Sequence, residues 1–163
     1  DDHPNTLMVM SNLAGAYTDD EQYEKAEALL LQRIPLSKQR YGENHWRVAT
    51  GEDGLGRFYL NAKNFERAEE MFKKSTALYS ESLGVTHNWT AISTVYLAFC
   101  KAVNGSTEES DILFRDSYAT LLSNKDNFEY YEKTMFEIML NFLKMHPMNV
   151  WHEEIALLEE LKK

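Results

Sequence analysis

The chain contains few of the residues that form turns, cross-links and metal sites. Its 163 residues include one cysteine, three prolines and seven glycines. A single cysteine excludes an internal disulfide and a four-cysteine zinc site, and it fits a reducing compartment or simple packing. So few prolines and glycines do not suit a many-stranded sandwich or barrel, and they favour long helices. An all-α fold is therefore expected.

Basic residues and long apolar runs are also scarce. Seventeen Lys and Arg residues stand against 26 Asp and Glu residues, which gives a formal net charge of −9. Such a chain repels a phosphate backbone, so nucleic acid is not an expected partner. The most hydrophobic stretch, residues 135–143, still contains Glu137 and Asn141. No run reaches the roughly 18 apolar residues of a membrane-spanning helix, so no membrane span is expected.

An internal repeat of 42 residues organises what is present. Three sets of identical residues recur at this interval: His3, His45 and His87; Leu13, Leu55 and Leu97; Glu24, Glu66 and Glu108. Periods of about 20–50 residues are typical of solenoids, whose units pack on their neighbours in the chain. We therefore expect one domain over residues 1–163, with repeats at 3–44, 45–86 and 87–127.

The apolar spacing within each repeat is helical. In the first repeat, one helical face is formed by Leu7, Met10, Ala14 and Tyr17. Polar residues interrupt the pattern at 19–22 and 61–64, and a second face follows at Tyr23, Ala26 and Leu30, and again at Phe65, Ala68 and Phe72. Small side chains at Ala26 and Ala68 allow two helices to approach closely. The predicted fold is an α-solenoid of three to four antiparallel helix hairpins.

Two features depart from a regular helical pattern. Pro35 removes one backbone hydrogen bond from the second helix, so we expect a kink or an early helix end near Ile34. Gly51 and Gly54 each lower helix propensity by roughly 1 kcal/mol relative to alanine, which predicts a soft spot there. Gly56, in contrast, takes the small-residue position of Ala14 in the first repeat.

Residues 128–163 follow the repeat less closely. They contain two helix-like segments separated by His146-Pro147. A proline is tolerated in the first turn of a helix but not in its interior, so it separates the two segments. We expect either a degenerate fourth hairpin or a pair of capping helices, and the sequence leaves open whether the chain was cut from a longer array.

The first two repeats carry a family resemblance. Their pattern is represented by Asn12-Leu13-Ala14, Tyr17, Tyr23-Glu24-Lys25-Ala26-Glu27 and Tyr41-Gly42. These residues resemble a tetratricopeptide repeat of the 42-residue kinesin-light-chain type, in which repeats often open with His-Pro, as at His3-Pro4. The resemblance is strong over residues 3–86 and weakens in the third copy. It implies a tetratricopeptide superhelix whose concave groove binds a peptide or a protein partner.

The resemblance places the first helix of each repeat on the concave side. There we expect Asn12, Asp53, Arg57, Tyr96 and Phe99 to contact a peptide. Asn12 matches an asparagine that repeats of this type place in the groove. The third copy is apolar on two faces, so its second face is either covered by the C-terminal helices or forms an apolar anchor beside Arg57.

No constellation of residues indicates catalysis or metal binding. The three repeated histidines lie on successive hairpins, separated by at least about 10 Å, which is too far for one zinc ion. We expect them to satisfy helix N-termini or inter-repeat turns. A Gly-x-Ser-x-Gly motif and a paired Cys and His are both missing. The sequence thus predicts no enzyme, no metal and no cofactor.

The leading hypothesis is a non-catalytic, cytoplasmic interaction scaffold, similar to the adaptor repeats of kinesin light chains. The alternative is a sensor or oligomerisation segment of a larger signalling protein, such as an NTPase-linked receptor. The net charge of −9 favours a basic or mixed apolar and basic peptide as the ligand. The oligomeric state is left open by the sequence.

Overall fold

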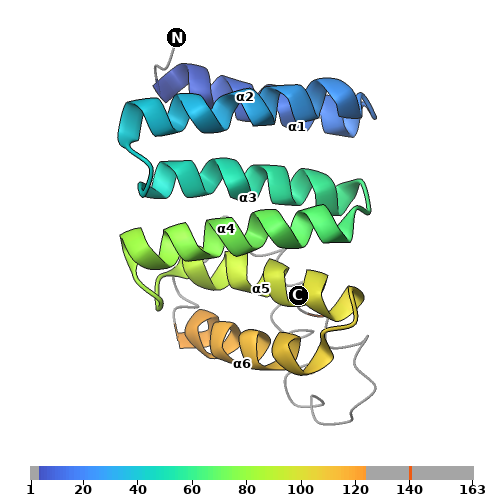
Figure 1. Cartoon of the computed structure of the whole chain (residues 1–163), viewed down its shortest axis with the longest axis vertical. Helices are drawn as coiled ribbons and strands as arrows, with labels where there is room; N and C mark the ends of the chain where they lie inside the picture. Colours follow the sequence, from blue (N-terminus) through green and yellow to red (C-terminus); the bar gives the residue numbers. More distant parts are fainter. Residues whose placement is uncertain (1–3, 124–139, 141–163) are drawn as a thin grey trace.

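The computed structural model describes residues 4–123 and residue 140 of the chain. Its six helices are α1 (Pro4–Asp19), α2 (Tyr23–Tyr41), α3 (Trp46–Asn61), α4 (Phe65–Leu83), α5 (Asn88–Val103) and α6 (Thr107–Ser123). This part of the chain contains no strand. The helices form three antiparallel hairpins that stack in chain order (Figure 1). The predicted all-α solenoid is confirmed, whereas the expected C-terminal hairpin or cap at 128–163 lies, except for Leu140, outside the described residues.

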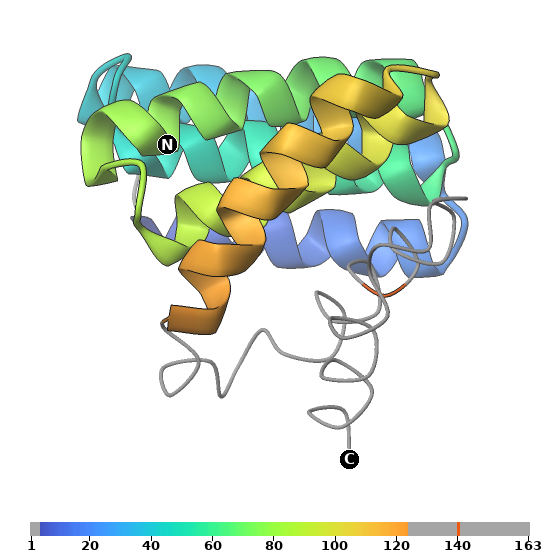
Figure 2. The same cartoon turned by 90° about the horizontal axis from the view of Figure 1, so that it is seen from below.

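The hairpins form successive layers, and the direction of the helices changes along the stack. Each helix packs mainly on the helices next to it in sequence, and α1 and α3 touch only slightly. Figure 2 looks along the stack, and there α6 crosses the other helices at an angle. Packing of this kind leaves one face of α1 and α3 available to line a groove.

The turns repeat the same backbone geometry from hairpin to hairpin. Within the hairpins, Glu21, Lys63 and Gly105 have positive φ values of 59°, 57° and 93°. Between hairpins, Gly42 and Gly84 have φ values of 90° and 98°. Glycine meets no steric penalty in this region, whereas a residue with a Cβ atom does. The repeat in the sequence is therefore also a repeat in the backbone.

Two of the repeated histidines begin helices. The Nδ1 atom of His45 accepts a hydrogen bond from the backbone N–H of Arg47 at 3.1 Å. The Nδ1 atom of His87 accepts one from the backbone N–H of Trp89 at 3.1 Å. The expected helix-terminus role is confirmed for these two residues, and His3 lies outside the described residues.

Pro35 does not end its helix. We expected a kink or an early end near Ile34, but α2 continues as far as Tyr41, so the early end is wrong. Pro35 and Leu31 both lie on the exposed side of α2. Water can therefore bond the Leu31 carbonyl that lacks its usual N–H partner, which reduces the penalty of the proline.

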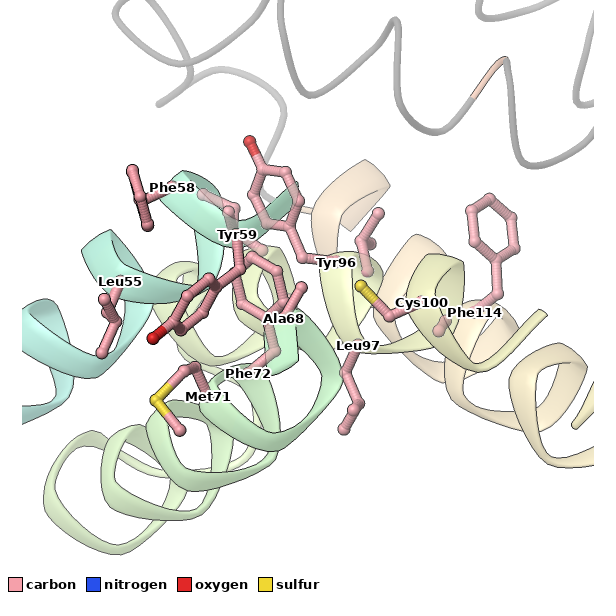
Figure 3. Packing of buried hydrophobic residues seen from close by; sticks show 14 of the residues in the cluster. Leu55, Phe58, Tyr59, Ala68, Met71, Phe72, Tyr96, Leu97, Cys100 and Phe114 are labelled. Carbon is pink, nitrogen blue, oxygen red and sulfur yellow. The ribbon is translucent and has the colours of Figure 1, made fainter. Parts of the chain in front are cut away.

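One continuous core joins the hairpins. Figure 3 shows buried side chains of α3, α4, α5 and α6 meeting in it. The two predicted crossing residues, Ala26 and Ala68, are both fully buried. On α4, Phe72 is also fully buried, and its ring stacks on Tyr96 of α5 at a centroid distance of 5.0 Å. The core therefore extends across the hairpin boundary between α4 and α5.

Two glycines of α3, Gly51 and Gly56, stand where neighbouring side chains come very close. A Cβ atom on Gly56 would lie 2.9 Å from the ring of Phe72. A Cβ atom on Gly51 would lie 2.7 Å from Nη1 of Arg33. Both glycines belong to the continuous helix α3. Close packing therefore explains why glycine occurs at these positions although it has a low helix propensity.

We predict opposite effects of alanine at two helical glycines. Gly56→Ala pushes a methyl group into the buried Phe72 ring, so we expect a net destabilisation of about 1–2 kcal/mol after the gain in helix propensity. Gly15→Ala is the matched control, because nothing lies within 4 Å of its Cβ position. It should stabilise the fold by up to about 1 kcal/mol. Urea unfolding measures both, and equal stability of the two variants would contradict the packing at Gly56.

The histidine cap is tested at the start of α5. His87→Ala removes the acceptor for the Trp89 N–H, and we expect a loss of about 1 kcal/mol in the free energy of unfolding. His87→Asn keeps an acceptor at this position and should retain most of the stability. Thermal unfolding compares the two variants, and equal melting temperatures for them would show that the cap does not stabilise α5.

Candidate functional site

A cavity of about 820 Å³ runs along α1 and α3 and reaches the first two turns of α5. Its walls include one face of α1 and one face of α3: Asn5, Met8, Asn12 and Gly15 on α1, and Arg47, Thr50, Gly54 and Arg57 on α3. The spacing of three or four residues keeps each row on one side of its helix. The cavity therefore lies on the side of the hairpins that the family resemblance predicted for the groove.

The five predicted site residues are not all brought together. Asn12, Asp53 and Arg57 line the cavity. Tyr96 is only 3% exposed, stacks on Phe72 and is not among the lining residues. Phe99 is half-buried, and its ring meets Phe65 edge-on at 6.3 Å. The structure thus groups three of the five along the cavity and places two in packing contacts.

The second apolar face of α5 is covered. Ile92, Val95 and Tyr96 are buried, and Leu140 belongs to the same core cluster. Of the two alternatives considered for this face, coverage agrees with these exposures. The helices expected to provide the cover fall, apart from Leu140, outside the described residues.

Asp53 and Arg57 form an ion pair one turn apart on α3. The Nε atom of Arg57 donates to Oδ2 of Asp53 at 2.8 Å, and the guanidinium lies 5.0 Å from the centroid of the Tyr96 ring. Burial raises the pKa of the Asp53 carboxyl, although the charge of Arg57 and its hydrogen bond oppose this shift. Burial alone would lower the pKa of Arg57, but Asp53 and nearby tyrosines outweigh it and raise that pKa. The two charges hold each other in place and largely cancel.

A buried arginine forms the inner wall of the cavity. Arg33 of α2 is 8% exposed, and burial lowers the pKa of its guanidinium. Its Nε donates to the carbonyl of Leu7 at 3.2 Å, and its Nη2 donates to Oγ1 of Thr50 at 2.7 Å. An arginine side chain keeps its proton in proteins, so Arg33 places a permanent positive charge between α1, α2 and α3.

Aromatic rings gather at the end of the cavity where α3 and α5 begin. Trp46 meets Trp89 at 5.9 Å, and Trp89 meets Tyr79 at 5.6 Å, both with rings edge to face. The guanidinium of Arg47 lies 4.6 Å from the Trp46 ring centroid and 5.2 Å from that of Tyr41. All five side chains line the cavity. This end can therefore receive an apolar group beside a fixed positive charge.

Sequence reasoning missed several of these residues. Arg47 and Trp89 share one position of the 42-residue repeat with Asn5, one helical turn before the position of Met8. Extending the concave row by one turn would have found them. Arg33 carries no such signal, because it lies on the second helix of its hairpin, where the pattern predicts packing.

The charge that lines the cavity is opposite in sign to that of the chain. Among the described lining residues, three arginines stand against Asp53 alone, whereas the whole chain carries −9. Acidic side chains gather elsewhere, for example at Glu66, Glu69 and Glu70 of α4, which line a separate depression. Local field rather than net charge acts on a bound group, so the cavity attracts negative groups.

The described residues offer no metal-binding cluster, reactive thiol or membrane-spanning helix. Within residues 4–123 and residue 140, no cluster of three or more His, Cys, Asp or Glu side chains could hold a metal ion. Cys100 is fully buried, and burial raises the pKa of its thiol to about 12, so it remains a protonated packing residue. Across the described helices, none has the length and apolar character needed to cross a bilayer.

Solved structures similar to the chain show the same fold. Two of them contain kinesin light chain TPR-like repeats from Podosopora anserina, one being a variant of the other. Each is 20% identical to the chain, with TM-scores of 0.74 and 0.75. The alignments cover 98% of this chain and 74% of theirs. No curated protein is significantly similar to the chain.

The family profile agrees with the repeat. The tetratricopeptide repeat profile matches twice, over residues 6–47 and residues 53–88. These two matches contain α2 and α4 completely, α1 from residue 6 onward, and most of α3. Together with the hairpin stack, they identify these residues as tetratricopeptide repeats. Residues 6–47 and 53–88 are thus tetratricopeptide repeats, and the chain shares its fold with the solved kinesin light chain TPR-like repeats.

Proposed function

We propose that the chain is a non-catalytic interaction scaffold whose cavity along α1 and α3 holds an extended segment of a protein partner. Tetratricopeptide repeats generally serve protein interaction and not catalysis. The observation that carries the proposal is the cavity of about 820 Å³, which combines aromatic rings, amides and arginines in one continuous lining. Recognition of peptides requires apolar pockets and polar groups that reach the peptide backbone.

Three lining residues are the proposed polar contacts. Asn12 is exposed, and its amide can both donate to and accept from a peptide backbone. Arg57, held by Asp53 at 2.8 Å, offers its remaining donors from a fixed position. Tyr96 lies beneath Arg57 and supports it instead of touching the ligand. A lining held in this way loses little freedom on binding, which favours affinity.

The proposed ligand is acidic and apolar, and this replaces the basic peptide expected from the net charge. Arg57 is paired with Asp53, so the uncompensated positive charges are those of Arg33 and Arg47. Arg47 is exposed beside Trp46, where a carboxylate next to an apolar side chain would find both contacts. We also propose the repeat boundaries 3–44, 45–86 and 87–127 and a cytoplasmic location, the latter supported by a single buried thiol.

Peptides selected from a phage-displayed random library test this function. We expect the wild-type chain to select peptides with net negative charge and at least one aromatic or aliphatic anchor. Arg47→Glu should weaken their binding by about tenfold, about 1.4 kcal/mol, measured by isothermal titration. An acidic residue in the first turn of α3 suits the helix dipole, so this variant should stay folded.

The matched control is Lys73→Glu, which changes the net charge equally on an exposed position of α4 outside the cavity. It should leave the affinity within about twofold, because surface charges at a distance are screened by salt. Selection of basic peptides, or equal losses in the two variants, would refute the proposed groove.

A further inference from the structure

One face of α1 is exposed although the equivalent faces of α3 and α5 are buried. Val9 is 57% exposed, Leu13 is 41% exposed, and Ala16 is exposed as well. These three residues follow one another at helical spacing, so they form one apolar stripe. We call Val9, Leu13 and Ala16 the outer stripe of α1.

The 42-residue repeat identifies what covers this stripe in the other hairpins. Its equivalents are buried in both cases: Gly51, Leu55 and Phe58 in α3, and Ser93, Leu97 and Cys100 in α5. In each case the covering element is the second helix of the preceding hairpin. A Cβ atom on Gly51 would meet Arg33 and Ile34 of α2, and the hydroxyl of Ser93 bonds Ser75 and Thr76 of α4 at 2.6 and 3.1 Å.

We infer that the outer stripe of α1 is an open repeat interface, which accepts the second helix of a further hairpin preceding α1 in the same array. The surface continues two interfaces already present, α2 on α3 and α4 on α5, with the same residues of the repeat. The interface is separate from the proposed peptide groove.

The size of Val9 determines which helix can pack on the outer stripe of α1. Arg33 and Ser75 are equivalent positions, and each faces the first stripe residue of the next hairpin. The large Arg33 is opposite Gly51, whereas the small Ser75 is opposite Ser93. Since packed interiors tolerate little extra volume, Val9 requires a small residue such as Gly, Ala or Ser on the helix that covers it.

Helix α4 meets this requirement without a polar penalty. The hydroxyl of Ser75 also bonds the carbonyl of Phe72 at 3.1 Å. It therefore keeps a partner when the residue opposite is Val9 and not Ser93. A second copy of residues 45–86 is thus a suitable hairpin to place before α1.

The test is a fusion in which residues 45–86 are joined directly to His3, so that the 42-residue register continues. In a solenoid the stability of neighbouring repeats is coupled through their interface. A docked hairpin should therefore raise the melting temperature of the chain by about 3 °C or more. Ser75→Arg in the added copy reproduces the large residue of α2 and should abolish the rise.

The matched rescue is Val9→Gly, which reproduces the Gly51 arrangement. It should restore the rise in melting temperature in the fusion that carries Ser75→Arg. The fusion, its two single variants and its double variant form a double-mutant cycle, which cancels the effect that glycine has on α1 by itself. An added hairpin that melts separately, or a rise that depends on neither substitution, overturns the inference. A stable dimer of the unfused chain that Leu13→Glu dissociates overturns it too, because a second copy would then occupy the stripe.

Discussion

The structure depends on a match of side-chain volumes wherever one helix crosses the next. Gly56 stands opposite Phe72, and a single added methyl group would already overlap the ring. The same large Phe72 then stacks on Tyr96 of the following hairpin. Each helix packs mainly on its neighbours in sequence, so a misfit at one crossing is not compensated by distant contacts. This constraint explains why glycines occur in the interior of α3.

The same packing creates the cavity and determines its charge. Arg33 can lie buried between α1, α2 and α3 because Gly51 leaves room for its guanidinium. Arg57 is held by Asp53 in the lining of the cavity. The acidic residues that dominate the composition lie on other faces, such as the start of α4. A chain of charge −9 therefore presents a groove whose charged lining residues are three arginines and one aspartate.

Much of the fold could be predicted because it follows from local patterns. His45 and His87, which are 42 residues apart, are helix caps, and Ala26 and Ala68 are fully buried at the crossings. The prediction for Pro35 failed because a helix can tolerate a proline where the freed carbonyl faces water. The sequence pattern does not show whether the carbonyl group freed by Pro35 is exposed to water.

The sequence by itself determined the helical repeat and its resemblance to tetratricopeptide repeats, because both depend on the spacing of residues along the chain. That resemblance predicted the side of each hairpin that could face a groove. The tertiary structure decided which residues on that side are accessible. Tyr96 and Phe99 have the correct spacing but are taken up by packing with Phe72 and Phe65, whereas Arg33 enters the lining from the second helix. Burial depends on what a neighbouring hairpin places opposite each residue, and that is a property of the assembled stack.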